Sequence, residues 1–117
     1  MKKYAAFAGL ILVSVVLSYC GPSKKATAAE MPKSTYATNV STVIMANCVP
    51  CHVPPKGGNK KPYDNFANVK ADIDEIIRRV ELNPSDRGFM PFKKPAKLSD
   101  STIAVFKQWK ADGMLEN

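Results

Sequence analysis

Histidine and cysteine are scarce in this chain of 117 residues, which contains one histidine, His52, and three cysteines, Cys20, Cys48 and Cys51. A tetrahedral structural zinc site needs four protein ligands, so a Cys/His site of this kind would have to use all four residues. No segment alternates apolar and polar residues like a β-strand, and no internal repeat is visible. The lack of a strand pattern argues against a thioredoxin-like α/β chain, in which a Cys-x-x-Cys pair opens a helix after a strand.

Cys48, Cys51 and His52 form a Cys-x-x-Cys-His sequence, which is the attachment signature of a c-type haem. Two thiols three positions apart on a turn of helix reach neighbouring pyrrole edges, and the adjacent imidazole is held beneath the iron. The motif therefore predicts one covalently bound haem c, with thioether bonds from Cys48 and Cys51 and with His52 as an axial iron ligand. The alternatives are a disulfide between the two cysteines or half of a zinc site.

The first 19 residues have the features of a secretory signal peptide. Lys2 and Lys3 precede an apolar stretch of thirteen residues, 5–17, which is shorter than the about 20 apolar residues of a membrane-spanning helix. The sequence Leu-Ser-Tyr-Cys at 17–20 resembles a bacterial lipobox, so we expect Cys20 to carry a lipid and to become the mature N-terminus. Tyr19 departs from that pattern, and the alternative is cleavage after Ala28, which would release a soluble periplasmic protein.

The exported chain divides into a tether and one domain. Residues 20–33 are rich in Lys, Ala, Pro, Ser and Thr without an apolar period, which is typical of a flexible tether. Residues 34–117 are left for a single small domain, whose core is marginal without added apolar volume. A covalently attached porphyrin would supply that volume. Export also excludes nucleic acid as a partner.

Apolar residues at helical spacing predict three helices in this domain. The first spans residues 35–48 and ends in the haem motif. The second spans 69–82 and stops at Asn83-Pro84, and the third follows a Ser99 cap and runs to about residue 112 before Gly113. The apolar positions of the first helix are Tyr36, Val40, Val43 and Ile44, and those of the third are Ile103, Phe106 and Trp109. Those of the second are Val69, Ile73, Ile76, Ile77 and Val80. In the second helix the charges suit the helix dipole, with Asp72, Asp74 and Glu75 near its start and Arg78 and Arg79 near its end.

The helix that ends in Cys-x-x-Cys-His, the middle helix, the Met90-Pro91 segment and the closing aromatic helix together resemble the class I monohaem cytochrome c family, in its bacterial lipoprotein form. The resemblance implies a small all-α fold of three main helices and loops around one attached haem, with the first and last helices packed together. It also implies a periplasmic electron carrier, anchored to the membrane by its lipid, rather than an enzyme.

Met90 is the predicted second axial ligand of the iron. Among the other methionines of the exported chain, Met31 lies in the tether, Met45 is interpreted as a core residue and Met114 would have to fold back. The family's distal methionine is likewise followed by proline in many members, as Met90 is by Pro91. The alternative is that Met90 covers the haem face without binding iron, which would leave an open site suited to a haem sensor or a minor peroxidase. A fixed haem subunit of a larger redox complex is a further alternative.

The surroundings of the haem are predicted more coarsely. A carbonyl of Pro54 or Pro55 is expected to accept the second ring N–H of His52. Trp109, Tyr63 and Arg87 are candidates for contact with a haem propionate, although for Trp109 packing between helices in the core is the favoured interpretation. The exported chain has 15 Lys and Arg, since Lys2 and Lys3 are removed, against 10 Asp and Glu. Six lysines flank the expected haem crevice and would steer the protein to a redox partner with an acidic docking face, unless they serve solubility alone. They are Lys56, Lys60, Lys61, Lys93, Lys94 and Lys97.

Overall fold

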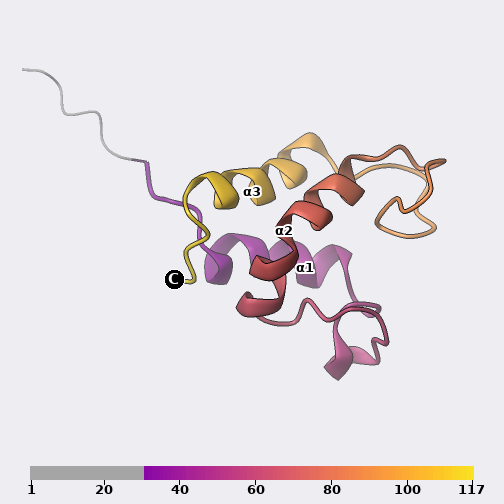
Figure 1. Ribbon diagram of the computed structural model, residues 1–117, viewed down its shortest axis with the longest axis horizontal. Coiled ribbons are helices and arrows are strands. Elements are labelled where there is room, and N and C mark those ends of the chain that lie inside the picture. Colours follow the sequence, from indigo (N-terminus) through magenta and orange to yellow (C-terminus); the bar gives the residue numbers. More distant parts are fainter. Residues whose placement is uncertain (1–30) are drawn as a thin grey trace, which may run out of the picture. The chain divides into compact units, whose positions relative to one another are not determined.

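The computed structural model describes residues 31–117. The predicted signal peptide, the lipidation site Cys20 and most of the tether lie outside this part of the chain. The elements in order are the π-helical turn η1 (Tyr36–Val40), α1 (Ser41–Asn47), the short 3-10 helix η2 (Pro54–Lys56), α2 (Phe66–Glu81) and α3 (Asp100–Ala111) (Figure 1). Residues 31–117 contain no β-strand, so this part of the chain is mainly helical, as predicted. None of its helices has the length and apolar character that crossing a membrane requires.

The first predicted helix is confirmed as η1 followed directly by α1. The side chain of Thr35 caps its start by accepting a hydrogen bond from the amide of Thr38. Val40 and Ile44 are buried on one face. The amide of Cys48 still donates to the carbonyl of Ile44 over 2.8 Å, so the helix leads without a break into the Cys-x-x-Cys-His motif.

The second helix, α2, starts three residues earlier than predicted, at Phe66. The side chain of Asn65 accepts from the amide of Asn68 over 3.0 Å and caps this earlier start. Asp72, Asp74 and Glu75 therefore lie in the middle of α2, and its first turn contains no acidic residue. The prediction that these carboxylates complement the helix dipole at its start is wrong, and their roles come from side-chain contacts.

The third helix, α3, is confirmed at both ends. Ser99 caps it by accepting from the amide of Thr102 over 3.2 Å. At the other end Gly113 adopts a φ of 93°, a left-handed conformation that favours glycine. The amide of Met114 then donates to the carbonyl of Trp109 over 2.9 Å. Ile103, Phe106 and Trp109 form the buried face of α3, as predicted.

The first and last helices share one core, as the cytochrome resemblance implies. Val40 and Ile44 of the first helix pack in the same buried cluster as Phe106 and Trp109 of α3. The rings of Tyr36 and Trp109 lie 6.2 Å apart between centroids. Trp109 is fully buried and its Nε1–H donates to the carbonyl of Leu115 over 2.7 Å, which confirms its interpretation as a residue that packs between helices and leaves its ring N–H already bonded.

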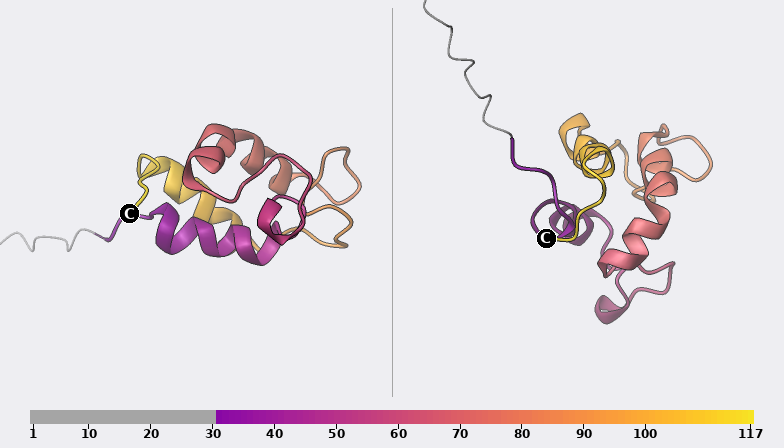
Figure 2. Two further views of the ribbon diagram at one scale, coloured as in Figure 1. Left: turned by 90° about the horizontal axis from the view of Figure 1, so that it is seen from below. Right: turned by 60° about the vertical axis from the view of Figure 1, so that its left-hand side comes forward.

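The C-terminal residues fasten the start of the first helix. The carbonyl of Leu115 accepts from the amide of Tyr36 over 2.9 Å, and that of Glu116 accepts from the amide of Ala37 over 3.0 Å. Both ends of the described chain therefore meet at one end of the helices. The motif segment 48–63 and the loop 83–98 lie toward the other end (Figures 1 and 2).

Candidate functional site around Cys48, Cys51 and His52

The Cys-x-x-Cys-His motif continues the first helix as a tight turn. The amide of His52 donates to the carbonyl of Cys48 over 3.0 Å, and the amide of Val53 donates to that of Pro50 over the same distance. Cys51 is exposed and Cys48 is partly buried, and both are free thiols. Burial raises the pKa of the Cys48 thiol to about 11. The alternative disulfide between Cys48 and Cys51 is therefore not present in the structure.

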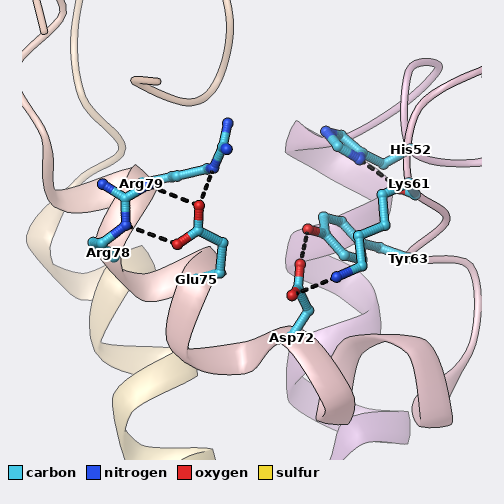
Figure 3. A network of polar contacts seen from close by, with 7 residues as sticks. All are labelled: His52, Lys61, Tyr63, Asp72, Glu75, Arg78 and Arg79. Atoms are coloured by element: carbon cyan, nitrogen blue, oxygen red, sulfur yellow. Dashed lines mark hydrogen bonds and ion pairs between the residues drawn. The ribbon is translucent and has the colours of Figure 1, made fainter. Parts of the chain in front are cut away.

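The imidazole of His52 is oriented by the backbone of Lys61. Its Nδ1 lies 2.7 Å from the Lys61 carbonyl oxygen (Figure 3). A carbonyl oxygen only accepts, so Nδ1 carries the hydrogen and Nε2 of the neutral ring keeps a free lone pair. In Figure 3 Nε2 points away from the Lys61 backbone. This tautomer suits His52 as a ligand through Nε2.

The prediction that Pro54 or Pro55 accepts from His52 is wrong. These prolines belong to the 3-10 helix η2, where the carbonyl of Pro54 accepts from the amide of Gly57 over 2.9 Å. The chain then returns, and residues 60–63 run beside the motif. The amide of Lys60 donates to the carbonyl of Cys51 over 3.0 Å and that of Tyr63 to the carbonyl of His52 over 2.7 Å. This return brings the Lys61 carbonyl to the ring.

Gly58 makes the close return possible. A Cβ atom at this position would overlap the carbonyl oxygen of Pro50 and would lie 2.7 Å from that of Cys51 and 2.8 Å from the amide nitrogen of Val53. All three are backbone atoms of the motif turn and cannot rotate away. Only glycine lets the chain pass this close.

Tyr63 stacks on His52 from the same segment. The two rings are 4.6 Å apart between centroids and only 14° from parallel. The Tyr63 hydroxyl donates to the carboxylate of Asp72 on α2 (Figure 3). It is thereby committed to Asp72, so the predicted contact of Tyr63 with a haem propionate is not supported. Burial and the Asp72 carboxylate raise the pKa of Tyr63 well above its usual value, which keeps the hydroxyl protonated.

Asp72 also binds the side chain of Lys61. Its Oδ1 lies 2.5 Å from the Lys61 ammonium, while its Oδ2 accepts from Tyr63. Burial alone would raise the pKa of the Asp72 carboxyl. The hydrogen bonds from Lys61 and Tyr63 outweigh burial and hold its pKa below the usual value. Asp72 is therefore an ionised carboxylate with both oxygens in use.

Met90 lies in the loop 83–98, held against the C-terminal part of α2. Its amide donates to the carbonyl of Arg79 over 3.2 Å. The preceding residue, Phe89, is buried with 5% of its surface exposed, and Met90 itself is partly buried. At the start of the loop, the amide of Asn83 donates to the Asp86 carboxylate over 2.8 Å. The loop thus has a defined conformation in which Met90 follows a buried anchor.

The other methionines lie elsewhere in the domain. Met45 has 47% of its surface exposed, so its interpretation as a core residue is wrong. It follows the buried Ile44, and one residue further along a helix the side chain is rotated by about 100° out of the core. Met114 packs against the core cluster behind α3, and Met31 is 85% exposed.

Charged side chains lie along the C-terminal half of α2. Glu75 accepts from Arg78 over 2.7 Å and from Arg79 over 2.6 Å (Figure 3), and these hydrogen bonds lower the pKa of Glu75 to about 2. Arg87, a candidate for propionate contact, is exposed. The six lysines of the predicted crevice are all exposed, and among them only Lys61 takes part in an ion pair within residues 31–117.

The residues of this site include the groups that covalent haem attachment needs. In the part of the chain that the structure describes, no three side chains of His, Cys, Asp or Glu gather into a group that could hold a metal ion. Two free thiols and an imidazole with a free Nε2 are the groups that haem attachment requires. Comparisons of the chain with protein-family models, with curated proteins and with solved structures find no match.

Sequence reasoning missed three contributors to the site. Asp72 was assigned to the dipole of α2, although it contacts Tyr63 and Lys61. The Lys61 carbonyl is a backbone group, which no residue pattern marks. Gly58 is the third, and the Gly57-Gly58 pair after two prolines is the sequence signal that could have indicated its close backbone approach.

Proposed function

We propose that this protein is an electron-transfer protein: a lipid-anchored, monohaem c-type cytochrome on the periplasmic side of a bacterial membrane. The observation that carries the proposal is the state of His52, which is the only histidine and follows two free cysteines at haem-attachment spacing. Its Nδ1–H is engaged by the Lys61 carbonyl, so Nε2 is available to iron. Bound haem supplies a one-electron couple between ferric and ferrous iron.

Cys48 and Cys51 would hold the haem by thioether bonds, with His52 and Met90 as axial ligands. A thioether ligand favours ferrous iron and raises the reduction potential relative to two imidazoles. A filled sixth position also leaves no place for dioxygen or peroxide, so the protein would carry electrons and catalyse no reaction of its own. The bond from Met90 N to the Arg79 carbonyl and the buried Phe89 support this role, since they restrain the loop that presents Met90.

Both ends of the described chain lie on the side of the domain opposite the motif. Residues 34–37 are fastened to the C-terminus: the amide of Ser34 donates to Asp112 over 2.7 Å and that of Tyr36 to Leu115. The described chain therefore begins, at residue 31, at the end of the helices away from the segments 48–63 and 83–98 (Figure 2). The lysines near the motif are exposed, so they are available to an acidic redox partner.

The test of the ligand set is Met90→Ala. We expect loss of the near-infrared charge-transfer band of a methionine-ligated ferric haem, a lower potential and ready binding of cyanide or carbon monoxide. Met45→Leu and Met114→Leu are the matched controls and should keep the band. A wild-type protein that already lacks the band and binds cyanide would favour the sensor or peroxidase alternative.

A further inference from the structure

Asp72 is the centre of a polar cluster that the proposed function does not use. Its side chain has 13% of its surface exposed and ends in contact with the Lys61 ammonium, at 2.5 Å, and with the hydroxyl of Tyr63. Tyr63 is buried with 7% of its surface exposed. A largely buried carboxylate with both oxygens occupied is costly to assemble and rigid once its hydrogen bonds are satisfied.

Both residues that Asp72 binds also hold His52. Lys61 supplies the carbonyl that accepts the Nδ1–H over 2.7 Å, and Tyr63 lies parallel to the imidazole at 4.6 Å between centroids. The first contact fixes the direction of the ring's nitrogens, and the second fixes the plane of the ring. The backbone bonds from Lys60 and Tyr63 tie this segment to the motif alone, whereas Asp72 ties it to α2 (Figure 3).

We propose that Asp72 is a positioning residue for the axial imidazole: through Lys61 and Tyr63 it sets the ring plane of His52 and the strength of its Nδ1 hydrogen bond. This inference rests on the proposed role of His52 as an iron ligand. A hydrogen bond at Nδ1 makes the imidazole a stronger electron donor and so stabilises ferric iron. Loosening that bond should raise the reduction potential, and freeing the ring plane should alter the rhombic g-values of the low-spin ferric haem.

Three variants separate positioning from a plain effect of charge. Asp72→Asn removes a negative charge, Lys61→Met removes a positive one, and Tyr63→Phe removes none while it keeps the stacked ring. By Coulomb's law alone the reduction potential should rise in Asp72→Asn, fall in Lys61→Met and stay unchanged in Tyr63→Phe. The positioning role predicts a rise in all three. Lys61→Met is decisive because the two accounts give opposite signs for it.

The matched control for charge is Asp74→Asn. Asp74 lies on the same helix, is exposed and pairs with Lys110 of α3 over 2.5 Å, and it has no hydrogen bond or ion pair to residues 60–63. The Asp74→Asn substitution should leave the g-values of the ferric haem unchanged. Positioning also predicts non-additivity: in the double variant Lys61→Met with Tyr63→Phe, adding Asp72→Asn should change the g-values little, since its two links to His52 are already broken.

The experiment is electron paramagnetic resonance and redox titration of the purified haem-loaded variants. Shifted g-values with a raised potential in Lys61→Met and Tyr63→Phe would support the proposal, even if Asp72→Asn fails to accumulate. A lowered potential in Lys61→Met, with g-values as in the wild type, would overturn it and leave the cytochrome assignment intact. A wild-type protein without haem, or with haem not bound by His52, would remove the proposed function and this inference together.

Discussion

Replacing Gly58 by alanine should disturb the motif directly, because the new Cβ would overlap the Pro50 carbonyl oxygen and lie 2.7 Å from that of Cys51. These are backbone atoms, so the turn that carries both cysteines must shift. Overpacking of this kind costs about 1–3 kcal/mol. For a domain of 60–100 residues each kcal/mol lowers the melting temperature by about 4–8 °C, so we expect a loss of about 4–24 °C.

The assay is thermal unfolding of the haem-loaded protein, followed by circular dichroism, together with its absorption spectrum and potential. Gly57→Ala is the matched control: a Cβ there meets nothing within 4 Å, but the φ of 89° is strained for alanine and costs about 1–2 kcal/mol. Both variants should therefore melt earlier, while only Gly58→Ala should also change the spectrum and potential or reduce haem loading. A Gly58→Ala protein with wild-type melting and spectrum would refute the close packing of residue 58 on the motif.

Three further predictions follow from charge and export. Lys94→Glu should slow electron transfer to an acidic partner at low salt, and the difference from the wild type should shrink as the salt concentration approaches about 0.1 M, where the Debye length is about 10 Å. The control Lys33→Glu, near the start of the described chain, should have less effect. Equal losses of rate in both variants would place the docking face elsewhere. Because the folded-state pKa of Glu75 lies near 2, below its usual 4.5, its pairing with two arginines stabilises the fold above pH 4.5 and is lost as the pH falls toward 2; the melting-temperature gap between wild type and Glu75→Gln should close over that window, and a gap that persists at pH 2 would contradict this. Cys20→Ala should move the haem protein from the membrane to the soluble fraction or leave the precursor uncleaved, whereas mass spectrometry that finds an unlipidated N-terminus at Ala29 would instead support simple cleavage.

Local signals were enough to predict the first and third helices. Thr35 and Ser99 are side-chain caps, and the apolar residues behind them keep a helical period, so tertiary packing and local preference agree. Asn65 is also a good N-cap residue, but the prediction starts α2 at the first aliphatic position, Val69. It therefore misses the first three residues of the helix. That error moved Asp72 into the first turn and concealed its contact with Tyr63.

The candidate site was only partly predictable for a related reason. The Cys-x-x-Cys-His motif and Met90 are sequence features, and the segments that contain them, 48–63 and 83–98, lie toward the same end of the helices (Figure 1). The acceptor for His52 depends instead on how residues 53–63 fold back, which Gly58 permits but does not specify. Every residue has a backbone carbonyl, so no residue type indicates that the Lys61 carbonyl is the acceptor for His52. Only the three-dimensional structure identifies this partner.

The most direct test of the account is whether haem stays with the denatured polypeptide. Acid–acetone treatment removes haem that is held by ligation alone, while thioether bonds survive it. We predict that the precipitated wild-type chain keeps one iron haem, seen as added mass on the peptide that contains Cys48 and Cys51, and that the variant with both cysteines changed to alanine loses it. Haem released into the acetone from the wild type, or one equivalent of zinc in place of iron, would contradict the assignment.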